Sequence, residues 1–436
     1  MTEVGALQDR GVRAVRLLYT DLHGIARGKD IPISKFEALA EEGVAFCAAV
    51  MSTDLRHTPV VGGEEGYVDF SVRPDLGTLR VLPWQPDVAW CVGDARLPDG
   101  SGPAPTCPRG LLRRVVGLYA EKGLDPVVGP ELEFFLLERD PSAPGGLRRY
   151  VDELSRVYTV GPISDPRGIV LDMLYACEQL DLRVFAANHE FMNSQYEINI
   201  EHSGALDAAD RGFLLKTAIK ELAARQSMVA TFMGKPFNDQ GGSGFHVHLS
   251  VGRDGKNAFD SPDGSLRSSF VAGVLEHGPA LTALLAPTVN AYKRLVPDSL
   301  APTHVNWGRD NRTAFVRVPN ERGHRSRVEV RAGDGSACAH LATAAVLLAG
   351  LDGIERELSP PAAVTGDAYR ADEPDAGTRL PADLGSALDA LAADAWLRDG
   401  LGEELVETFF AVKRFELERF GQWVTDWELD EYARHL

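Results

Sequence analysis

Cysteine is scarce in this sequence, and the few cysteines present form no recognisable framework. Five occur among 436 residues, widely spaced and without a Cys-x-x-Cys pair. An odd number of scattered thiols argues against a disulfide-stapled fold and against a thiolate zinc site, and it is typical of proteins kept in a reducing compartment. A chain of this length also buries a core large enough to need no covalent staples.

Basic charge and long apolar runs are also in short supply. The 63 acidic residues outnumber the 45 basic ones, giving a formal net charge of −18, and such a surface repels nucleic acid and anionic membranes. No run of about 18 apolar residues occurs, so no membrane-spanning helix is expected. The first residues, MTEVGALQDRG, lack the basic and apolar segments of a signal peptide. We therefore expect a cytoplasmic protein without nucleic-acid or membrane partners.

Two common phosphate-binding motifs are absent as well. The sequence contains neither a GxxxxGK[S/T] loop nor a kinase-type glycine-rich loop. If the protein handles a nucleotide, metal ions and arginines must hold the phosphates instead.

The order of apolar patterns and turn residues predicts a small mixed domain followed by a larger α+β domain. A stretch rich in glycine and proline, residues 97–108, is interpreted as the linker, which places the domains at residues 1–100 and 108–436. The predicted elements are strands at 12–18 and 127–137, helices at 110–122 and 205–231, an exposed loop at 359–381, and helices from 384 to 436.

Several predicted strands carry acidic, imidazole or guanidinium side chains two residues apart. Residues at i and i+2 lie on the same face of a strand. The positions are Glu131 and Glu133, His246 and His248, and Arg327, Glu329 and Arg331, while Glu190 and Glu197 come from a further segment. Taken singly, each pattern is also typical of a half-solvated antiparallel strand.

The combination of these strands favours a metal centre. Carboxylates grouped on one surface repel each other unless a cation lies between them. Glutamates with one or two histidines suit hard divalent ions, and a nitrogen ligand favours Mg²⁺ or Mn²⁺ over Ca²⁺.

Six segments, in order along the chain, resemble the glutamine synthetase family. They are GPELEFF (129–135), HEFMNSQYEI (189–198), GKPFNDQGGSGFHVHLS (234–250), NAYKRLVP (290–297), NRTAFVRVP (311–319) and SRVEVRAGDGSACAHLA (326–342). The resemblance implies an N-terminal β-grasp domain and a C-terminal catalytic domain built on a curved antiparallel sheet. It also implies active sites between neighbouring subunits of a ring, commonly two stacked hexamers, so a homo-oligomer, and specifically a dodecamer, is expected.

Carried over position by position, the resemblance assigns a role to each site residue. The positions correspond to ligands of a first metal ion beside the amino-acid substrate (Glu133, Glu190, Glu197), ligands of a second ion beside the nucleotide phosphates (Glu131, His246, Glu329), substrate-binding residues (Arg294, Arg331, Gly242), catalytic arginines that neutralise the transferring phosphoryl group (Arg312, Arg317) and ATP-binding residues (His248, Ser250, Arg327). The implied cofactors are ATP and two or three Mg²⁺ or Mn²⁺ ions.

Two positions depart from the family where ammonia-using members bind ammonium. Those members use an aspartate from the neighbouring subunit and a glutamate on a flap, and here Cys47 and Leu300 stand at these places. A thiol and an isobutyl group neither hold a small cation nor accept its proton, and they favour an apolar substituent. The predicted nucleophile is therefore an amine larger than ammonia, for which Asp298, Glu321 or Asp334 could serve as base or anchor.

Together these features predict an ATP-dependent carboxylate–amine ligase. It would join the γ-carboxylate of glutamate, or a related dicarboxylate, to an amine other than ammonia through a γ-glutamyl phosphate. The predicted partners are thus glutamate, an amine and ATP. Two alternatives stay open, namely an ammonia-using glutamine synthetase and a non-catalytic structural or regulatory member of the family.

Overall fold

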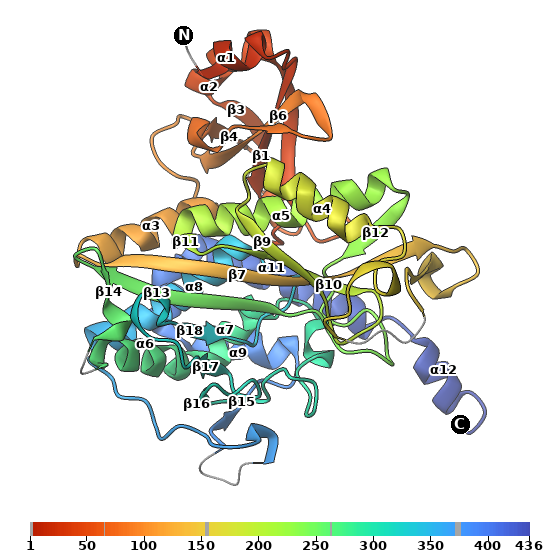
Figure 1. Cartoon of the computed structure of the whole chain (residues 1–436), viewed down its shortest axis with the longest axis vertical. Helices are drawn as coiled ribbons and strands as arrows, with labels where there is room; N and C mark the ends of the chain where they lie inside the picture. The colour runs from red at the N-terminus through yellow and green to blue at the C-terminus, as the bar shows by residue number, and fades with distance from the viewer. Residues whose placement is uncertain (1–2, 65, 153–156, 262–263, 371–375) are drawn as a thin grey trace.

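The computed structural model describes residues 3–64, 66–152, 157–261, 264–370 and 376–436 (Figure 1). The helices are α1 (Glu3–Asp9), α2 (Ile33–Glu42), α3 (Pro108–Ala120), α4 (Ile169–Gln179), α5 (Ala205–Arg225), α6 (Ser265–Glu276), α7 (Gly278–Leu285), α8 (Ala339–Glu355), α9 (Leu384–Ala393), α10 (Ala395–Leu401), α11 (Glu403–Gly421) and α12 (Asp426–Tyr432). The strands are β1 (Ala14–Thr20), β2 (Ala26–Pro32), β3 (Val44–Cys47), β4 (Asp69–Pro74), β5 (Arg80–Leu82), β6 (Gln85–Arg96), β7 (Asp125–Arg139), β8 (Leu147–Arg149), β9 (Val184–His189), β10 (Gln195–Ile200), β11 (Ser203–Gly204), β12 (Met228–Thr231), β13 (Phe245–Arg253), β14 (Lys256–Asn257), β15 (His304–Val305), β16 (Trp307–Arg309), β17 (Val316–Val318), β18 (Val328–Val330) and β19 (Thr378–Arg379).

The N-terminal part folds as a six-stranded β-grasp sheet in the order β2-β1-β6-β4-β3, with β5 paired to β6. Strand β1 runs parallel to β6 and antiparallel to β2. The rings of Tyr19, Phe46 and Phe70 pack edge-on or stacked in its core. In Figure 1 this sheet stands above the rest of the molecule.

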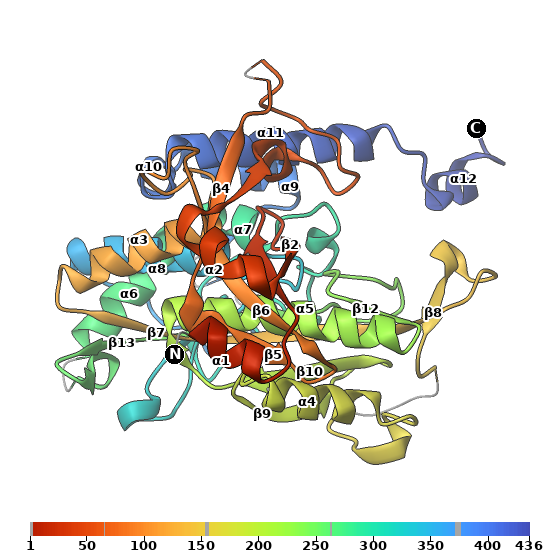
Figure 2. The same ribbon diagram turned by 90° about the horizontal axis from the view of Figure 1, so that it is seen from above.

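The larger part is built on an 11-stranded curved sheet whose main path is β16-β17-β18-β13-β7-β10-β9. Strand β7 is 15 residues long and pairs antiparallel with β13 and β12 along one edge and with β10 along the other. Helices α3, α5 and α8 pack against β7, as the second view shows (Figure 2). Helix α8 is apolar on all sides and lies buried, which is what an all-round hydrophobic helix requires. The predicted α+β class is confirmed.

A buried arginine joins the two sheets. Arg109, at the start of α3, donates from Nε and Nη2 to both carboxylate oxygens of Asp210 on α5, each at 2.8 Å. Its Nη1 and Nη2 also lie 2.8 Å from Asp94 on β6 and from Asp75. Such a bidentate, fully hydrogen-bonded guanidinium fixes the orientation of the N-terminal sheet relative to the catalytic sheet.

Two sequence-based predictions are wrong in part. The helix predicted at 205–231 ends at Arg225, because Ser227 adopts a left-handed φ of 58° and residues 228–231 form β12, which pairs with β7. The loop predicted at 359–381 contains a 3₁₀ turn at Ala368–Arg370 and the short strand β19, paired with β15. Residues 371–375 of that loop lie outside the described part of the chain. The strand expected at 127–137 and the helix expected at 110–122 are confirmed as β7 and α3.

Helix α12 projects from the body of the molecule in both views (Figures 1 and 2). Among the described residues, no helix is both long and apolar enough to cross a lipid bilayer.

Candidate active site

Most of the predicted site residues line one cavity of about 1010 Å³. They are Glu131, Glu133, Glu190, Glu197, Gly242, His246, His248, Arg294, Leu300, Arg312, Arg317, Arg327, Glu329 and Arg331. The cavity lies on the face of β7 that is opposite the helices, because the alternate residues Leu132 and Phe134 belong to the helix-covered core. Two predicted residues do not line it. Ser250 lines an adjoining cavity, and Cys47 is exposed on β3.

The strand register explains why these residues meet. His246 pairs with Glu131 across β13 and β7, and His248 pairs with Glu329 across β13 and β18. Directly opposed residues of an antiparallel pair present their side chains on the same face, with Cβ atoms about 4.5–5.5 Å apart. The i, i+2 pattern of each strand therefore becomes a continuous acidic and imidazole surface.

Glu133, Glu190 and Glu197 form a first carboxylate group. Glu197 lies directly opposite Glu133 in the β10–β7 pair. Burial, together with the neighbouring Glu190, raises the pKa of Glu133 to about 7. Burial also raises the pKa of Glu190 and, with the nearby carboxylates, raises that of Glu197 well above its usual value. Acids that resist ionising together form a site in which a cation is strongly favoured.

Glu131, His248 and Glu329 form a second group, in which one ligand atom from each residue lies within 4.8 Å of the others. Nδ1 of His246 is 2.9 Å from Oε1 of Glu131, and Nε2 of His248 is 2.9 Å from Oε2. Burial lowers the pKa of His246 to about 4, so its imidazole is neutral, as a metal ligand must be. The sequence placed only His246 with these glutamates, whereas the structure brings both imidazoles to Glu131.

The two groups could hold hard divalent ions. Both offer several carboxylate oxygens, and the second adds neutral imidazole nitrogen, a donor set that suits Mg²⁺ or Mn²⁺. Burial opposes ionisation of Glu329, but His248 and Arg331 outweigh it and hold the pKa of this carboxyl at about 2. The second group is therefore anionic at neutral pH.

Guanidinium groups close another side of the large cavity. Arg331 pairs with Glu329 through Nη1, donates from Nε to the carbonyl oxygen of Arg312 at 3.1 Å, and donates from Nη2 to the carbonyl oxygen of Leu300 at 3.1 Å. Nη1 of Arg317 lies 2.6 Å from Oε2 of Glu329. Arg317 on β17 and Arg331, directly after β18, thus converge on one carboxylate, and each could also contact an anionic ligand in the cavity.

The loop that contains Gly242 approaches the buried side chain of Arg294 closely. Arg294 lies with Nη2 3.4 Å from Nε2 of His246. A Cβ atom at Gly242 would lie 2.2 Å from the carbonyl oxygen of Gly234 and 2.8 Å from Cγ of Arg294. Only glycine fits such a position, so this glycine permits the loop to pass directly against the aliphatic part of the Arg294 side chain.

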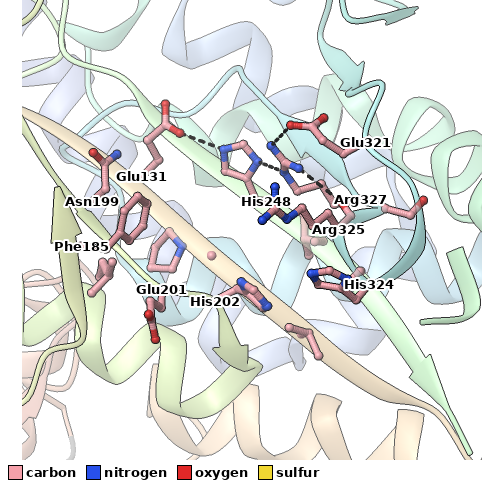
Figure 3. A pocket seen from close by; sticks show the side chains of 17 residues that line it. Glu131, Phe185, Asn199, Glu201, His202, His248, Glu321, His324, Arg325 and Arg327 are labelled. Carbon is pink, nitrogen blue, oxygen red and sulfur yellow. Dashed lines mark hydrogen bonds and ion pairs between the residues drawn. The ribbon is translucent and has the colours of Figure 1, made fainter. Parts of the chain in front are cut away.

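A second cavity, of about 370 Å³, adjoins the first (Figure 3). Glu131, His248 and Arg327 line both cavities, while Ser250 lines only the smaller one. Nε of Arg327 donates to Nδ1 of His248 at 3.2 Å, which leaves Nε2 of the same ring to donate to Glu131. Figure 3 shows this chain continuing from Arg327 to Glu321.

Aromatic and imidazole side chains that were not assigned to the site from the sequence complete the smaller cavity. Phe185, His202 and His324 line it and are labelled in Figure 3. Phe185 is 63% exposed on β9, so the cavity presents an apolar ring at its edge. Planar rings of this kind are suited to a flat heteroaromatic ligand. No sequence pattern marks these residues, because they come from separate loops and strand ends.

The buried amide of Gln195 and the half-buried amide of Asn199 were also missed. Nε2 of Gln195 donates to Oε2 of Glu133 at 2.7 Å and to the carbonyl oxygen of Gly242 at 3.0 Å. Nδ2 of Asn199 donates to Oε1 of Glu197 at 2.7 Å. Gln195, Glu197 and Asn199 follow the same i, i+2 spacing on β10, and that spacing was the signal available in the sequence.

The two positions that depart from the ammonium-binding pattern lie apart in this chain. Leu300 lines the large cavity with a left-handed φ of 56° and its side chain partly exposed. Cys47 lies in the N-terminal sheet, where Sγ is 3.6 Å from the carbonyl oxygen of Tyr67. Within one subunit, only Leu300 therefore belongs to the cavity.

Comparison with known proteins agrees with the motifs. The sequence pattern described as "Glutamine synthetase, catalytic domain" matches residues 105–432. The glutamine synthetase of Methanocaldococcus jannaschii is 36% identical over 442 residues, covering 98% of this chain and 96% of that protein. That of Thermotoga maritima is 36% identical over 444 residues, covering 98% and 97%.

Solved structures extend the similarity to the whole fold. One described as "GmaS/ADP complex-Conformation 1" has a TM-score of 0.89 at 31% identity, with 100% of both chains covered. Another, "Apo GmaS without ligand", has a TM-score of 0.87 at 31% identity, with 99% of both chains covered. The matched catalytic region includes every strand that lines the large cavity. On this sequence and structural similarity, the chain belongs to the glutamine synthetase family of ATP-dependent ligases.

Proposed function

We propose that this protein forms an amide between the γ-carboxylate of glutamate and an amine other than ammonia, with ATP as the energy source. The proposal rests on one observation: Leu300 lines the large cavity at the position where ammonia-using members of the family have a carboxylate. The nearest acid on that wall, Asp298, has a side chain that is 74% exposed and lies 4.0 Å from Arg370. The carboxylate of Asp298 therefore faces solvent and is not positioned to hold a buried ammonium ion.

The reaction would begin with transfer of the γ-phosphoryl group of ATP to the glutamate carboxylate. Arg294 and Arg331 would hold the α-carboxylate of glutamate, since a guanidinium binds a carboxylate through two parallel hydrogen bonds. Arg312 and Arg317 would neutralise charge that spreads over the phosphoryl oxygens. The adjoining cavity, with Phe185 at its edge, would take the nucleotide base.

Mg²⁺ or Mn²⁺ would be held by Glu133, Glu190 and Glu197 in the first group and by Glu131, Glu329 and the histidines His246 and His248 in the second. When bound, such ions supply electrostatic stabilisation to the transferring phosphoryl group. The glutamates of the first group would also orient the amino-acid substrate through the Gly242 loop, because Gln195 bridges Glu133 and the carbonyl oxygen of Gly242.

In the second step the amine nitrogen would attack the carbonyl carbon of the acyl phosphate. The C–N bond forms, the C–O bond to phosphate breaks, and the nitrogen loses a proton. Leu300, Val296 and Phe191 are apolar residues of the cavity lining, and such a lining favours an amine with an alkyl substituent. Glu321 lines both cavities and could accept the proton.

Structural similarity supports a substituted amine, because the GmaS structures, those of a γ-glutamylmethylamide synthetase, cover the whole chain. The second candidate, an ammonia-using glutamine synthetase, is favoured by the names of the relatives that are 36% identical. We favour the first because ammonia use requires an anionic group where Leu300 stands.

We further propose a ring-shaped homo-oligomer, with a dodecamer of two hexameric rings as the expected form and with residues 1–100 and 108–436 as its two domains. Cys47 is exposed and does not line the cavity of its own chain, so we expect it to meet a substrate in the site of a neighbouring copy. Mass photometry of the purified protein would give the number of subunits directly.

The function is tested by phosphate release from ATP in the presence of glutamate and Mg²⁺ with a panel of amines. The panel contains ammonia, methylamine, ethylamine, ethanolamine, putrescine and aniline, and mass spectrometry identifies each product. The proposal predicts turnover with at least one substituted amine and little with ammonia. Ammonia as the best substrate would contradict it.

A further inference from the structure

The segment that lines the cavity beside the proposed amine position accepts hydrogen bonds from two side chains that lie outside the segment. We call residues 296–301 the amine-side wall. The carbonyl oxygen of Leu300 accepts a hydrogen bond from Nη2 of Arg331 at 3.1 Å, and that of Ala301 accepts one from the hydroxyl of Tyr369 at 2.8 Å. Arg331 faces the cavity, whereas Tyr369 does not line it. Tyr369 therefore contacts the wall from behind.

The amine-side wall needs such support because its backbone conformation is unfavourable. Asp298 and Leu300 adopt left-handed φ angles of 61° and 56°. Residues with a Cβ atom seldom occupy this region, and they remain in it only where surrounding contacts hold them. The hydroxyl of Ser299 supplies a local contact, 3.0 Å from the carbonyl oxygen of Arg294. The same hydroxyl lies 2.5 Å from the carbonyl oxygen of Val296, while Arg331 and Tyr369 donate to the carbonyl oxygens of Leu300 and Ala301.

Tyr369 is itself fixed firmly. Its turn is joined to the loop that carries Arg312, since Nδ2 of Asn311 donates to the carbonyl oxygen of Gly366 at 2.8 Å and the amide of Ala368 donates to Oγ1 of Thr313 at 3.0 Å. The side chains Ala314, Val364 and Ala368 form a small buried cluster under this turn. Asn311 and Thr313 flank Arg312 on either side, so the turn bridges the phosphoryl end of the cavity and the amine-side wall.

We propose that Tyr369 is a positioning residue of the ligation reaction, which keeps the amine-side wall closed against water through its hydrogen bond to Ala301. The proposal rests on the proposed function. An acyl phosphate can react with the amine, giving amide and phosphate, or with water. In the second case the oxygen of water bonds to the carbonyl carbon, the C–O bond to phosphate breaks, and glutamate and phosphate are released with net hydrolysis of ATP. Exclusion of water decides between the two outcomes.

The test compares Tyr369→Phe with the wild-type enzyme in its native assembly. The substitution removes only the hydroxyl and keeps the ring. We expect glutamate-dependent ATP hydrolysis without amide formation to rise by about three- to tenfold relative to amide synthesis, in line with loss of one hydrogen bond. Tyr119→Phe is the matched control, because it also removes a hydroxyl donated to a backbone carbonyl at 2.8 Å, that of Leu347 in the core. The control should leave the ratio of amide to phosphate unchanged.

Hydrogen–deuterium exchange gives a second readout that does not depend on the substrate. Peptides covering residues 296–301 should exchange faster in Tyr369→Phe than in the wild type or in Tyr119→Phe. An unchanged ratio of amide to phosphate, or unchanged exchange in this segment, would overturn the proposal. If the wild type uses only ammonia, the proposed function fails, but the same ratio measured with ammonia and the same exchange experiment still decide the role of Tyr369.

Discussion

Glu133 and Glu197 lie directly opposite each other on the antiparallel strands β7 and β10. Like charges at such opposed positions destabilise a sheet. Here burial adds to the repulsion, and it raises the pKa of Glu133 to about 7. The pairing is therefore favourable only when a proton or a cation occupies the space between the carboxylates, and this requirement links the fold to the proposed chemistry.

Divalent metal should stabilise the folded protein through this pair. At a metal concentration about 100 times its dissociation constant, binding to the native state alone adds about 2.7 kcal/mol to the free energy of unfolding. Urea denaturation with Mn²⁺ and with EDTA, at fixed protein concentration, measures the difference. Glu133→Gln should remove most of the gain. Glu138→Gln, on the same strand but outside the cavity and paired with Arg148, should keep it. A gain that survives in Glu133→Gln would show that the ion binds elsewhere.

The nature of the residue at position 300 should set the preferred amine. Leu300→Glu places an anionic group where ammonia-using relatives have one, so it should raise kcat/KM for ammonia relative to an alkylamine by about tenfold, equivalent to ~1.4 kcal/mol. Leu300→Gln is the control, because it has the same shape as glutamate without the charge. Equal effects of the two substitutions would mean that size rather than charge decides the preference.

Arg109 should contribute strongly to the stability of the chain. Arg109→Met removes the guanidinium from Asp210, which is buried and, within the described part of the chain, would keep His340 as its one remaining ion-pair partner. Breaking a buried ion pair in this way costs about 3–5 kcal/mol. Arg113→Met is the matched control, because its side chain is 49% exposed beside the same Asp75 and Asp94 and should cost less than about 1 kcal/mol. Chemical denaturation of both variants tests the difference, and similar losses would contradict it.

His277 should make stability depend on pH in a defined direction. Burial lowers the pKa of His277, but hydrogen bonds to Asp394 at 2.6 Å and Asp352 at 3.1 Å outweigh it and raise that pKa above the ordinary value of 6.5. The stabilisation is therefore complete below about pH 6.5 and is lost as the pH rises through the folded-state pKa. Asp352 keeps Arg356 as a partner throughout, at 2.7 Å.

The measurement is denaturation of the wild type and His277→Gln at pH 5.5 and pH 8.5. The variant should be less stable by about 2 kcal/mol at the lower pH, since hydrogen bonds to charged groups contribute that much, and the difference should shrink at the higher pH. A difference that grows with pH would mean that the imidazole is bound in its neutral form.

The fold was predictable from the sequence where one periodicity dominates. The alternation around Glu131 and Glu133 predicted β7, and the apolar spacing after Gly110 predicted α3. The pattern failed at residues 228–231, whose apolar residues continue a helical spacing but pair with β7 instead. Pairing with a distant strand depends on tertiary contacts, and local periodicity carries no information on them.

The candidate active site, like the fold, was predictable in part from the sequence. Charged residues at i, i+2 on several strands indicated a metal centre, because grouped carboxylates repel each other unless a cation lies between them. The resemblance assigned only His246 to the second group, whereas in the structure both imidazoles reach Glu131, because His246 and His248 lie on one face of β13. Gln195 escaped notice because a neutral amide has no distinctive chemistry until its neighbours are known. Cys47 belongs to the cavity only if a second subunit supplies it, and a single chain cannot bring it there.

The most direct test of the proposed function is a competition in one reaction. The enzyme is given ATP, Mg²⁺ and glutamate with equal concentrations of ammonium and ethylamine, and mass spectrometry measures the ratio of γ-glutamyl ethylamide to glutamine at low conversion. That ratio equals the ratio of the two kcat/KM values. We predict that the ethylamide predominates, because Leu300 offers apolar contact and no anionic group at the nucleophile position. Glutamine as the main product would contradict the proposed function and identify the protein as an ammonia-using member of its family.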